Sequence, residues 1–183
     1  MAIRTWGYLT IAATDTPQPI FSSTLASAVI AATDGFGQPL PGPVLPFTSA
    51  AKFKKGDRLM IVETDGTLLE ISLIVGISTN NVTVDKILHS HAAGAWVILH
   101  ESMTAPYVQC GEANTAIIGI GTGRTASLST GAALIAILEP TVAGVQPEEF
   151  SCGNVFGANP MKSSDFWVVG TQSDKILPSF IST

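Results

Sequence analysis

Two histidines separated by one residue are the first candidates for chemistry in this sequence. His89 and His91 would lie on the same face of a strand, where a metal ion could bind both rings. Asp85 precedes them, but no cysteine or carboxylate has the spacing expected of a further ligand. We therefore favour a loop of solvated histidines, and the sequence predicts no metal and no other cofactor.

A glycine-rich stretch is the second candidate. Gly119, Gly121 and Gly123 precede Arg124 in a pattern that loosely resembles a phosphate-binding loop. Such a loop needs a helix that aims its first N–H groups at the anion. Residues 125–128 (TASL) do not favour a helix, and another glycine follows at position 131. A tight β-turn is therefore predicted instead.

Nucleophiles and acid–base pairs are weakly indicated. Cys110 could form a nucleophile–base pair with a histidine that is distant in the sequence. Glu148 and Glu149 are adjacent, so on a strand they would point to opposite faces and make a poor acid–base pair. No Gly-x-Ser-x-Gly elbow occurs. We predict no catalytic residue and expect that the chain is not an enzyme. Cys110 and Cys152 are expected as two reduced thiols, or as one bridge if the protein acts outside the cell.

The composition points to assembly. The 183 residues are 46% apolar and only 13% charged, whereas about 25% is usual for a globular domain. Such a surface favours burial against partners, although a monomer rich in Ala, Thr, Ser and Gly would score similarly. The net charge of −5 argues against nucleic acid, since Lys52, Lys54 and Lys55 form the only basic cluster. The longest apolar run, residues 132–138, is too short to span a membrane. No signal peptide is visible, so we expect synthesis in the cytoplasm.

The elements that would position these residues are short strands. Eleven prolines and 17 glycines leave little room for helices, so the chain is predicted to be all-β. Residues 51–101 alternate strands with tight turns at Asp65–Gly66 and Asn80–Asn81, which indicates a small β-barrel. Its expected strands cover residues 58–63, 68–77, 82–85 and 95–99.

The C-terminal block, residues 102–183, is predicted to be a β-sandwich or jelly-roll-like domain. Its expected strands cover residues 107–110, 116–120, 125–128, 133–138, 166–169 and 176–181. Residues 1–50 are expected to supply a strand at 6–12 and a proline-rich arm at 35–46, both packing with this block. Residues 24–32 could form a short helix or a strand. The barrel would then be inserted in, or appended to, the sandwich, and its exterior would be reached by neighbouring copies.

Several segments together resemble the virion proteins of tailed bacteriophages. Residues 53–61 (FKKGDRLMI), 74–77, 80–85 (NNVTVD) and 91–97 (HAAGAWV) are similar to the turns and hairpins of their small β-barrel modules. Residues 166–176 (FWVVGTQSDKI) and 13–20 (ATDTPQPI) look like parts of their capsid-surface proteins. The resemblance implies the family of capsid decoration, or cement, proteins.

That family resemblance implies a structural protein on the outer surface of a capsid. The implied partners are the major capsid protein and copies of the chain itself, as a homotrimer, with no nucleic acid and no membrane. The N-terminal strand and the proline-rich arm would reach onto neighbours, so that deleting residues 1–20 would abolish binding and leave the barrel folded. The alternatives are a tail, neck or baseplate component of the virion, and a glycan-binding module or small hydrolase.

Overall fold

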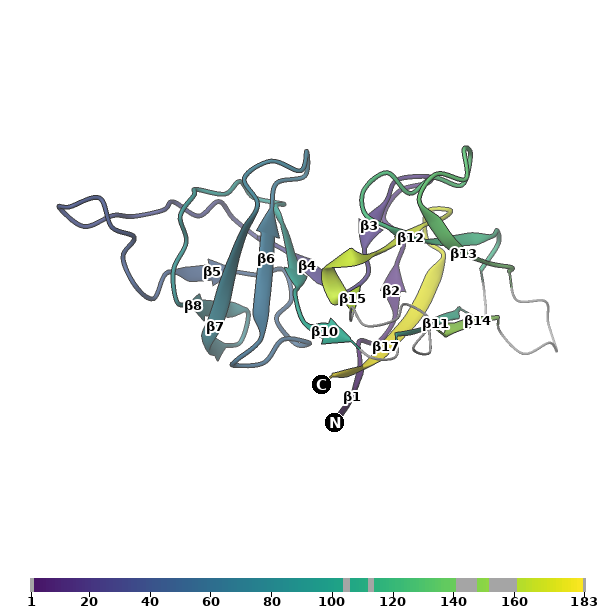
Figure 1. The fold of residues 1–183 in the computed structure, drawn as a ribbon, viewed down its shortest axis with the longest axis horizontal. Helices are drawn as coiled ribbons and strands as arrows, with labels where there is room; N and C mark the ends of the chain where they lie inside the picture. Colours follow the sequence, from purple (N-terminus) through teal and green to yellow (C-terminus); the bar gives the residue numbers. More distant parts are fainter. Residues whose placement is uncertain (1, 104–105, 112–113, 141–147, 152–160, 183) are drawn as a thin grey trace. The chain divides into compact units, whose positions relative to one another are not determined.

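The computed structural model describes residues 2–103, 106–111, 114–140, 148–151 and 161–182 of the chain (Figure 1). Within these ranges the chain is all-β: strands alternate with turns, and the single helical element is a 3-10 turn, Ser163–Asp165. The all-β prediction is therefore confirmed. The chain divides into two compact units, of which unit 1 comprises Met1–Phe21 and Ser102–Thr183 and unit 2 comprises Ser22–Glu101.

Unit 2 is built on one curled six-stranded sheet in the order β4-β9-β6-β7-β8-β5. The strands are β4 (Ser22–Thr24), β5 (Val44–Pro46), β6 (Arg58–Val62), β7 (Glu70–Ser78), β8 (Asn81–Val84) and β9 (Trp96–Leu99). The edge strands β4 and β5 approach each other, because Leu25 and Phe47 form an antiparallel bridge just beyond them. The backbone of Ala26 also donates to the carbonyl of Pro46 at 2.7 Å. The sheet thus curls into the shape of a small barrel.

The interior of unit 2 is filled by alternate residues of these strands. Leu45, Leu59, Ile61 and Val97 are fully buried, and the ring of Phe47 packs edge-on against Phe53 at 5.1 Å between centroids. This burial of branched and aromatic side chains supplies the main driving force for folding the unit.

The two predicted hairpin turns are present, and they differ in detail. Gly66 has a φ of +89°, and the backbone of Glu63 pairs with that of Thr67 around it. In the second turn the positive φ lies at Thr79 rather than at an asparagine. Asn80 is used differently, because its side-chain oxygen accepts a hydrogen bond from the backbone of Ala50 at 3.1 Å.

Unit 1 contains two sheets. The larger has the order β14-β11-β17-β10-β15, with β1 and β2 also paired to the long strand β17, and the smaller has the order β13-β12-β16-β3. The larger sheet comprises β1 (Ala2–Thr5), β2 (Leu9–Thr10), β10 (Ser102–Met103), β11 (Tyr107–Cys110), β14 (Glu149–Ser151), β15 (Met161–Lys162) and β17 (Lys175–Ser182). The smaller comprises β3 (Gln18–Pro19), β12 (Ile118–Thr122), β13 (Leu134–Leu138) and β16 (Phe166–Val169).

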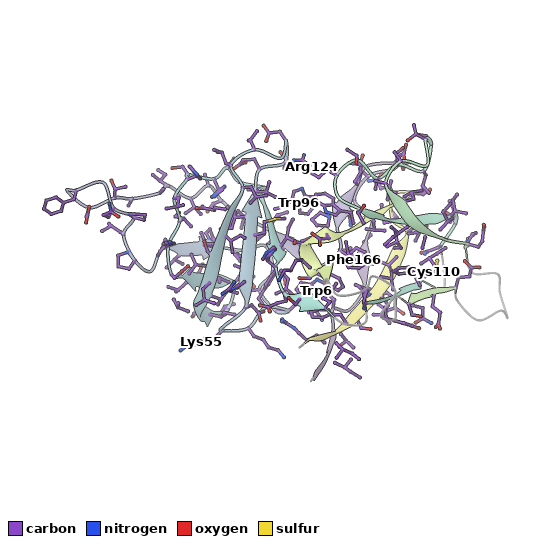
Figure 2. All side chains as sticks on the ribbon, viewed as in Figure 1. Trp6, Lys55, Trp96, Cys110, Arg124 and Phe166 are labelled. Atoms are coloured by element: carbon purple, nitrogen blue, oxygen red, sulfur yellow. The ribbon has the colours of Figure 1, made fainter. Side chains whose placement is uncertain are left out.

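Aromatic rings link the two sheets of unit 1. Phe21, which follows β3, packs edge-on against Phe180 of β17 at 5.0 Å and against Trp6 at 5.6 Å. Phe166 and Trp167 of β16 are also buried, as their position in an aromatic strand predicts. Figure 2 shows Trp6 and Phe166 among the side chains of this unit.

The position of residues 22–50 corrects the predicted domain boundary. They were expected to pack with the C-terminal block, but they belong to unit 2, where β4 pairs with β9 and β5 pairs with β8. The physical reason is that residues 58–99 supply only four strands, and β4 and β5 complete the curled sheet. Only residues 1–21 join the C-terminal part, where β1 pairs with β17.

The N-terminal residues are a second correction. Trp6, Ile11, Ile20 and Phe21 are buried in the core of unit 1. Deleting residues 1–20 would therefore remove core side chains, so it would test folding and not docking.

Two strand predictions and one left open between helix and strand also fail locally. Residues 125–128 form turns, residues 6–12 are interrupted by Gly7 with a φ of +75°, and residues 24–32 form neither a helix nor a continuous strand.

Candidate functional site

His91 is the centre of a buried polar cluster in unit 2. Its ring is 0% exposed and lies between two carboxylates. The Nδ1 atom is 3.1 Å from Oε1 of Glu63, and the Nε2 atom is 2.6 Å from Oε1 of Glu70. The prediction of solvated histidines is therefore right for His89, which is exposed, and wrong for His91.

Backbone donors hold both carboxylates in place. Oε1 of Glu63 also accepts from the backbone of Ala92 at 3.0 Å, and Oε2 of Glu70 accepts from the backbone of Leu88 at 2.6 Å. The cluster thus fastens residues 88–92 to both sides of the connection between β6 and β7, because Glu63 directly follows β6 and Glu70 begins β7. Such a fully bonded network fixes one conformation of a loop.

The geometry of this cluster does not suit a metal. The two ring nitrogens of an imidazole point in different directions, so carboxylates that face both of them do not converge on one point. Within the described ranges, no group of three His, Cys, Asp or Glu side chains has an arrangement that could hold a metal ion. We interpret the cluster as a structural one.

The carboxylates of this cluster were missed in the sequence, although a signal was present. Glu70 and Ser72 occupy inward positions of β7, in a strand whose other inward residue, Ile74, belongs to the core. A carboxylate at an inward position must find a partner, because an unpaired buried charge is costly. The hydroxyl of Ser72 donates to the carbonyl of Lys86 at 2.7 Å, which satisfies the second polar group.

The outward side of β7 is apolar. Ile71, Leu73 and Val75 alternate with the inward residues and are 46%, 38% and 38% exposed. Met60 of β6 lies directly opposite Ile71 and is half-buried. We call Met60, Ile71, Leu73 and Val75 the β7 outer face. A solvated sheet face usually carries polar residues, so this inversion is informative.

The glycine-rich stretch is a packing device rather than an anion site. Gly119 and Gly121 lie inside β12, and only Gly123 lies in a turn, with a φ of +84°. A Cβ atom on Gly121 would lie 2.5 Å from the Cβ of Ala126 and 2.8 Å from the carbonyl oxygen of Ala133. The predicted turn is thus replaced by a strand whose glycines allow close approach of neighbouring segments.

Cys110 and the histidines belong to different units. Cys110 is buried in unit 1, and its sulfur accepts a hydrogen bond from the side-chain amide of Asn114 at 2.9 Å. All three histidines belong to unit 2. Cys152, its possible disulfide partner in the sequence, lies outside the described residues.

The two adjacent glutamates have separate partners. Oε2 of Glu148 accepts from the backbone of Glu139 at 2.6 Å, and Oε2 of Glu149 accepts from the hydroxyl of Tyr107 at 2.5 Å. This hydrogen bond raises the pKa of Tyr107, and partial burial and the negative charge of Glu149 act in the same direction. The arrangement stabilises the pairing of β11 with β14.

The basic cluster lies on the surface of unit 2. Lys52, Lys54 and Lys55 are exposed in the segment that leads into β6, and Lys55 is labelled in Figure 2. The backbone of Lys54 donates to the carboxylate of Asp57 at 2.8 Å, which orders the turn. These three lysines therefore lie on a solvated turn.

A scan against protein-family models gave no match to the chain, and searches of curated proteins and of solved structures gave none either. In the part of the chain that the structure describes, no helix has the length and apolar character needed to cross a membrane.

Proposed function

We propose that the chain is a structural virion protein that coats the outer surface of a tailed-phage capsid and stabilises it. The observation that carries the proposal is the β7 outer face, where alternate large apolar side chains are presented to solvent on a strand that keeps its carboxylate inside. In a protein without partners these exposed side chains contribute no burial free energy, whereas a protein bound to a shell buries them against its surface. The sequence resemblance to decoration proteins supplies the identity of the shell.

The energetic argument follows from the exposed fractions. Fully burying one such side chain contributes roughly 1.5–3 kcal/mol. Since Ile71, Leu73 and Val75 are each 38–46% exposed, covering the rest of the three contributes about 2–4 kcal/mol in total. That is too little for a tight bimolecular complex. It is sufficient on a shell when copies are joined to one another, as in the trimer that the resemblance implies, because joined copies gain avidity.

The low charge of the chain supports the same proposal. Charged side chains are depleted at the centre of protein interfaces. Between residues 16 and 51 the only charged residue is Asp34. Copies of the chain and the capsid surface could therefore pack against this region without burying unpaired charges. The trimeric state that the resemblance implies stays a prediction.

A decoration assay tests the proposal. Heads prepared without this chain are mixed with the purified wild type, with Ile71→Asp, and with the matched control Ile137→Asp, and bound protein is measured after sedimentation. Ile137 is 52% exposed on β13 of unit 1, so both substitutions place a carboxylate at a similarly exposed isoleucine.

The proposal requires that the wild type and Ile137→Asp bind and that Ile71→Asp binds at least tenfold more weakly. Equal binding of the two variants would remove the β7 outer face from the interface. Failure of the wild type to bind heads, with binding to tails instead, would replace the proposal by a tail component.

A further inference from the structure

The proline-rich segment of unit 2 projects from its sheet as an arm. Residues 30–43, which we call the arm, leave the sheet after Val29 and return to it at β5 (Figure 1). The predicted arm at 35–46 is thus corrected, because its last three residues form β5. Val29 forms a backbone bridge with His91, and Thr33 forms one with Pro39 within the arm. The arm is therefore anchored at its base and closed on itself along its length.

The tip of the arm is ordered by Asp34. Its Oδ1 atom accepts from the backbone N–H groups of Phe36 and Gln38, each at 2.9 Å. The backbone of Asp34 donates to the carbonyl of Gln38 at 2.8 Å, and that of Leu40 donates to Ala32 at 2.9 Å. The one charged group of the region thus has its hydrogen bonds inside the tip.

This ordered tip carries a bare aromatic ring. Phe36 is 92% exposed, the largest exposure among the large apolar residues of the described chain. A ring on a preformed turn loses little conformational entropy when it binds, which makes it an efficient anchor. Phe36 contributes nothing to the core of unit 2, so its whole ring is available to a partner.

A groove that fits such a ring lies at the base of the arm. It has a volume of about 290 Å³ and is lined by apolar side chains only, among them Val29, Ile30, Leu40, Pro41, Val44 and Ile87. An apolar cavity of about 150 Å³ is sufficient to bind benzene. The groove therefore has room for a phenyl ring and for the proline or leucine side chains beside it.

The ring does not fill the groove of its own chain. Phe36 is not among the residues that line the groove, and its side chain is 92% exposed. The hydrogen bonds of Asp34 hold the tip in a closed turn directed along the arm. A second arm lying antiparallel to the first would place each tip at the base of the other. Because ring and groove lie on the same arm at the same spacing, both contacts form together in such a self-complementary pair.

We propose that Phe36 of one copy inserts into the apolar groove at the base of the arm of a second copy of this chain. The inference rests on the proposed function, in which copies meet on one surface, but its test needs only the isolated chain. Two buried rings cover about 300–500 Å². Stable interfaces bury at least about 1,200 Å². The contact is consequently weak between two free molecules and becomes effective where many copies are held side by side.

The test is a concentration series in the analytical ultracentrifuge. The wild type should self-associate reversibly at high protein concentration. Phe36→Ala removes the ring, and Leu40→Asp places a charge in the groove. Each should weaken association by roughly tenfold to a hundredfold per lost contact. Tyr8→Ala, which removes a ring that is 64% exposed in unit 1, is the matched control and should associate as the wild type does.

A mixing experiment distinguishes the proposed pairing from general stickiness. Phe36→Ala keeps an intact groove and Leu40→Asp keeps an intact ring, so a mixed pair retains one of the two contacts, whereas a pair of identical variants retains neither. The mixture should therefore associate more strongly than either variant alone and more weakly than the wild type. Ile30 is a second groove residue and is 80% exposed. A mixture of Ile30→Asp with Phe36→Ala should give the same result as the mixture of Leu40→Asp with Phe36→Ala.

A wild type that stays monomeric at every concentration would overturn the inference, as would association of Phe36→Ala at wild-type strength. A mixture that associates no more strongly than either variant alone would also overturn it. None of these results would alter the head-binding difference between Ile71→Asp and Ile137→Asp, so failure of this inference and failure of the proposed function are separable.

Discussion

Replacing Glu70 by alanine should destabilise unit 2 severely. The Glu70 carboxylate accepts from His91 Nε2 at 2.6 Å and from the backbone of Leu88 at 2.6 Å. Alanine leaves both groups without this acceptor, and the His91 ring is fully buried. Removing one partner from a buried pair costs about 3–5 kcal/mol. Because whole domains are stable by only about 5–15 kcal/mol, this loss is a large part of the total.

Glu70→Gln is the matched variant, and it should cost only about 1 kcal/mol. Its carbonyl oxygen can accept from Leu88 while its amide donates to His91 Nε2. The Nδ1–H group of a neutral His91 ring then still donates to Glu63, so every polar atom of the cluster keeps a partner. Glu70→Gln thus keeps both the size and the hydrogen bonds of the side chain, whereas Glu70→Ala removes the hydrogen bonds and leaves a cavity.

Native-state hydrogen exchange followed by mass spectrometry measures this difference within each unit. Protection of β6 and β9 should fall roughly a hundredfold or more in Glu70→Ala and about fivefold in Glu70→Gln. Protection of β16 in unit 1 serves as the internal reference. Equal protection in the alanine variant and the wild type would refute the reasoning, and so would a glutamine variant as damaged as the alanine variant.

Two further predictions concern unit 1. Gly121→Ala should lower the free energy of unfolding by about 1–3 kcal/mol, because its Cβ would meet a side-chain carbon at 2.5 Å and a carbonyl oxygen at 2.8 Å. The control Gly35→Ala lies in unit 2, where its Cβ would have nothing within 4 Å and its φ is not positive, so it should change the stability of unit 1 little. Equal urea midpoints of unit 1 in the two variants would contradict this packing argument. Tyr107 has a raised pKa in the folded chain, so the folded state holds the phenol proton more tightly than the unfolded state does. The resulting stability is present below the unfolded pKa of about 10 and is lost as the pH rises through the folded pKa. Tyr107→Phe has no phenol proton and should not lose this stability. Urea unfolding from neutral to alkaline pH should therefore show the free energy of unfolding falling more in the wild type than in the variant. A constant difference between the two would contradict the contact with Glu149.

The sequence was sufficient for elements whose local signals agree. Residues 107–110 and 166–169 combine β-branched, aromatic and alternating residues, and both form strands with the predicted bounds. Asp65–Gly66 forms the expected turn because glycine takes the positive φ without strain. Local propensity and tertiary packing favour the same conformation at these positions.

Elements that depend on distant partners could not be read in this way. β4 and β5 are three residues each, and they exist because they pair with β9 and β8. The composition of residues 22–50 does not reveal these partners, so the domain boundary was placed wrongly. Residues 125–128 have β-branched character, but they lie above the close-packed glycines of β12 and form turns.

The polar cluster and the β7 outer face were hard to predict from the sequence for the same reason. The alternation in residues 70–75 (EISLIV) predicts a strand, but apolar residues are normally assigned to the inside. The structure reverses this assignment for Ile71, Leu73 and Val75, because Glu70 and Ser72 find buried partners in residues 86–91. Alternation fixes which residues share a face, and only the partners decide which face is the inner one.

Cryo-electron microscopy of tailed-phage virions assembled in the presence of this chain tests the central proposal most directly. We predict density for the chain on the outside of the head, with Ile71, Leu73 and Val75 turned toward a neighbouring protein. Density confined to the tail, or a head-bound chain whose β7 outer face points into solvent, would contradict the proposal.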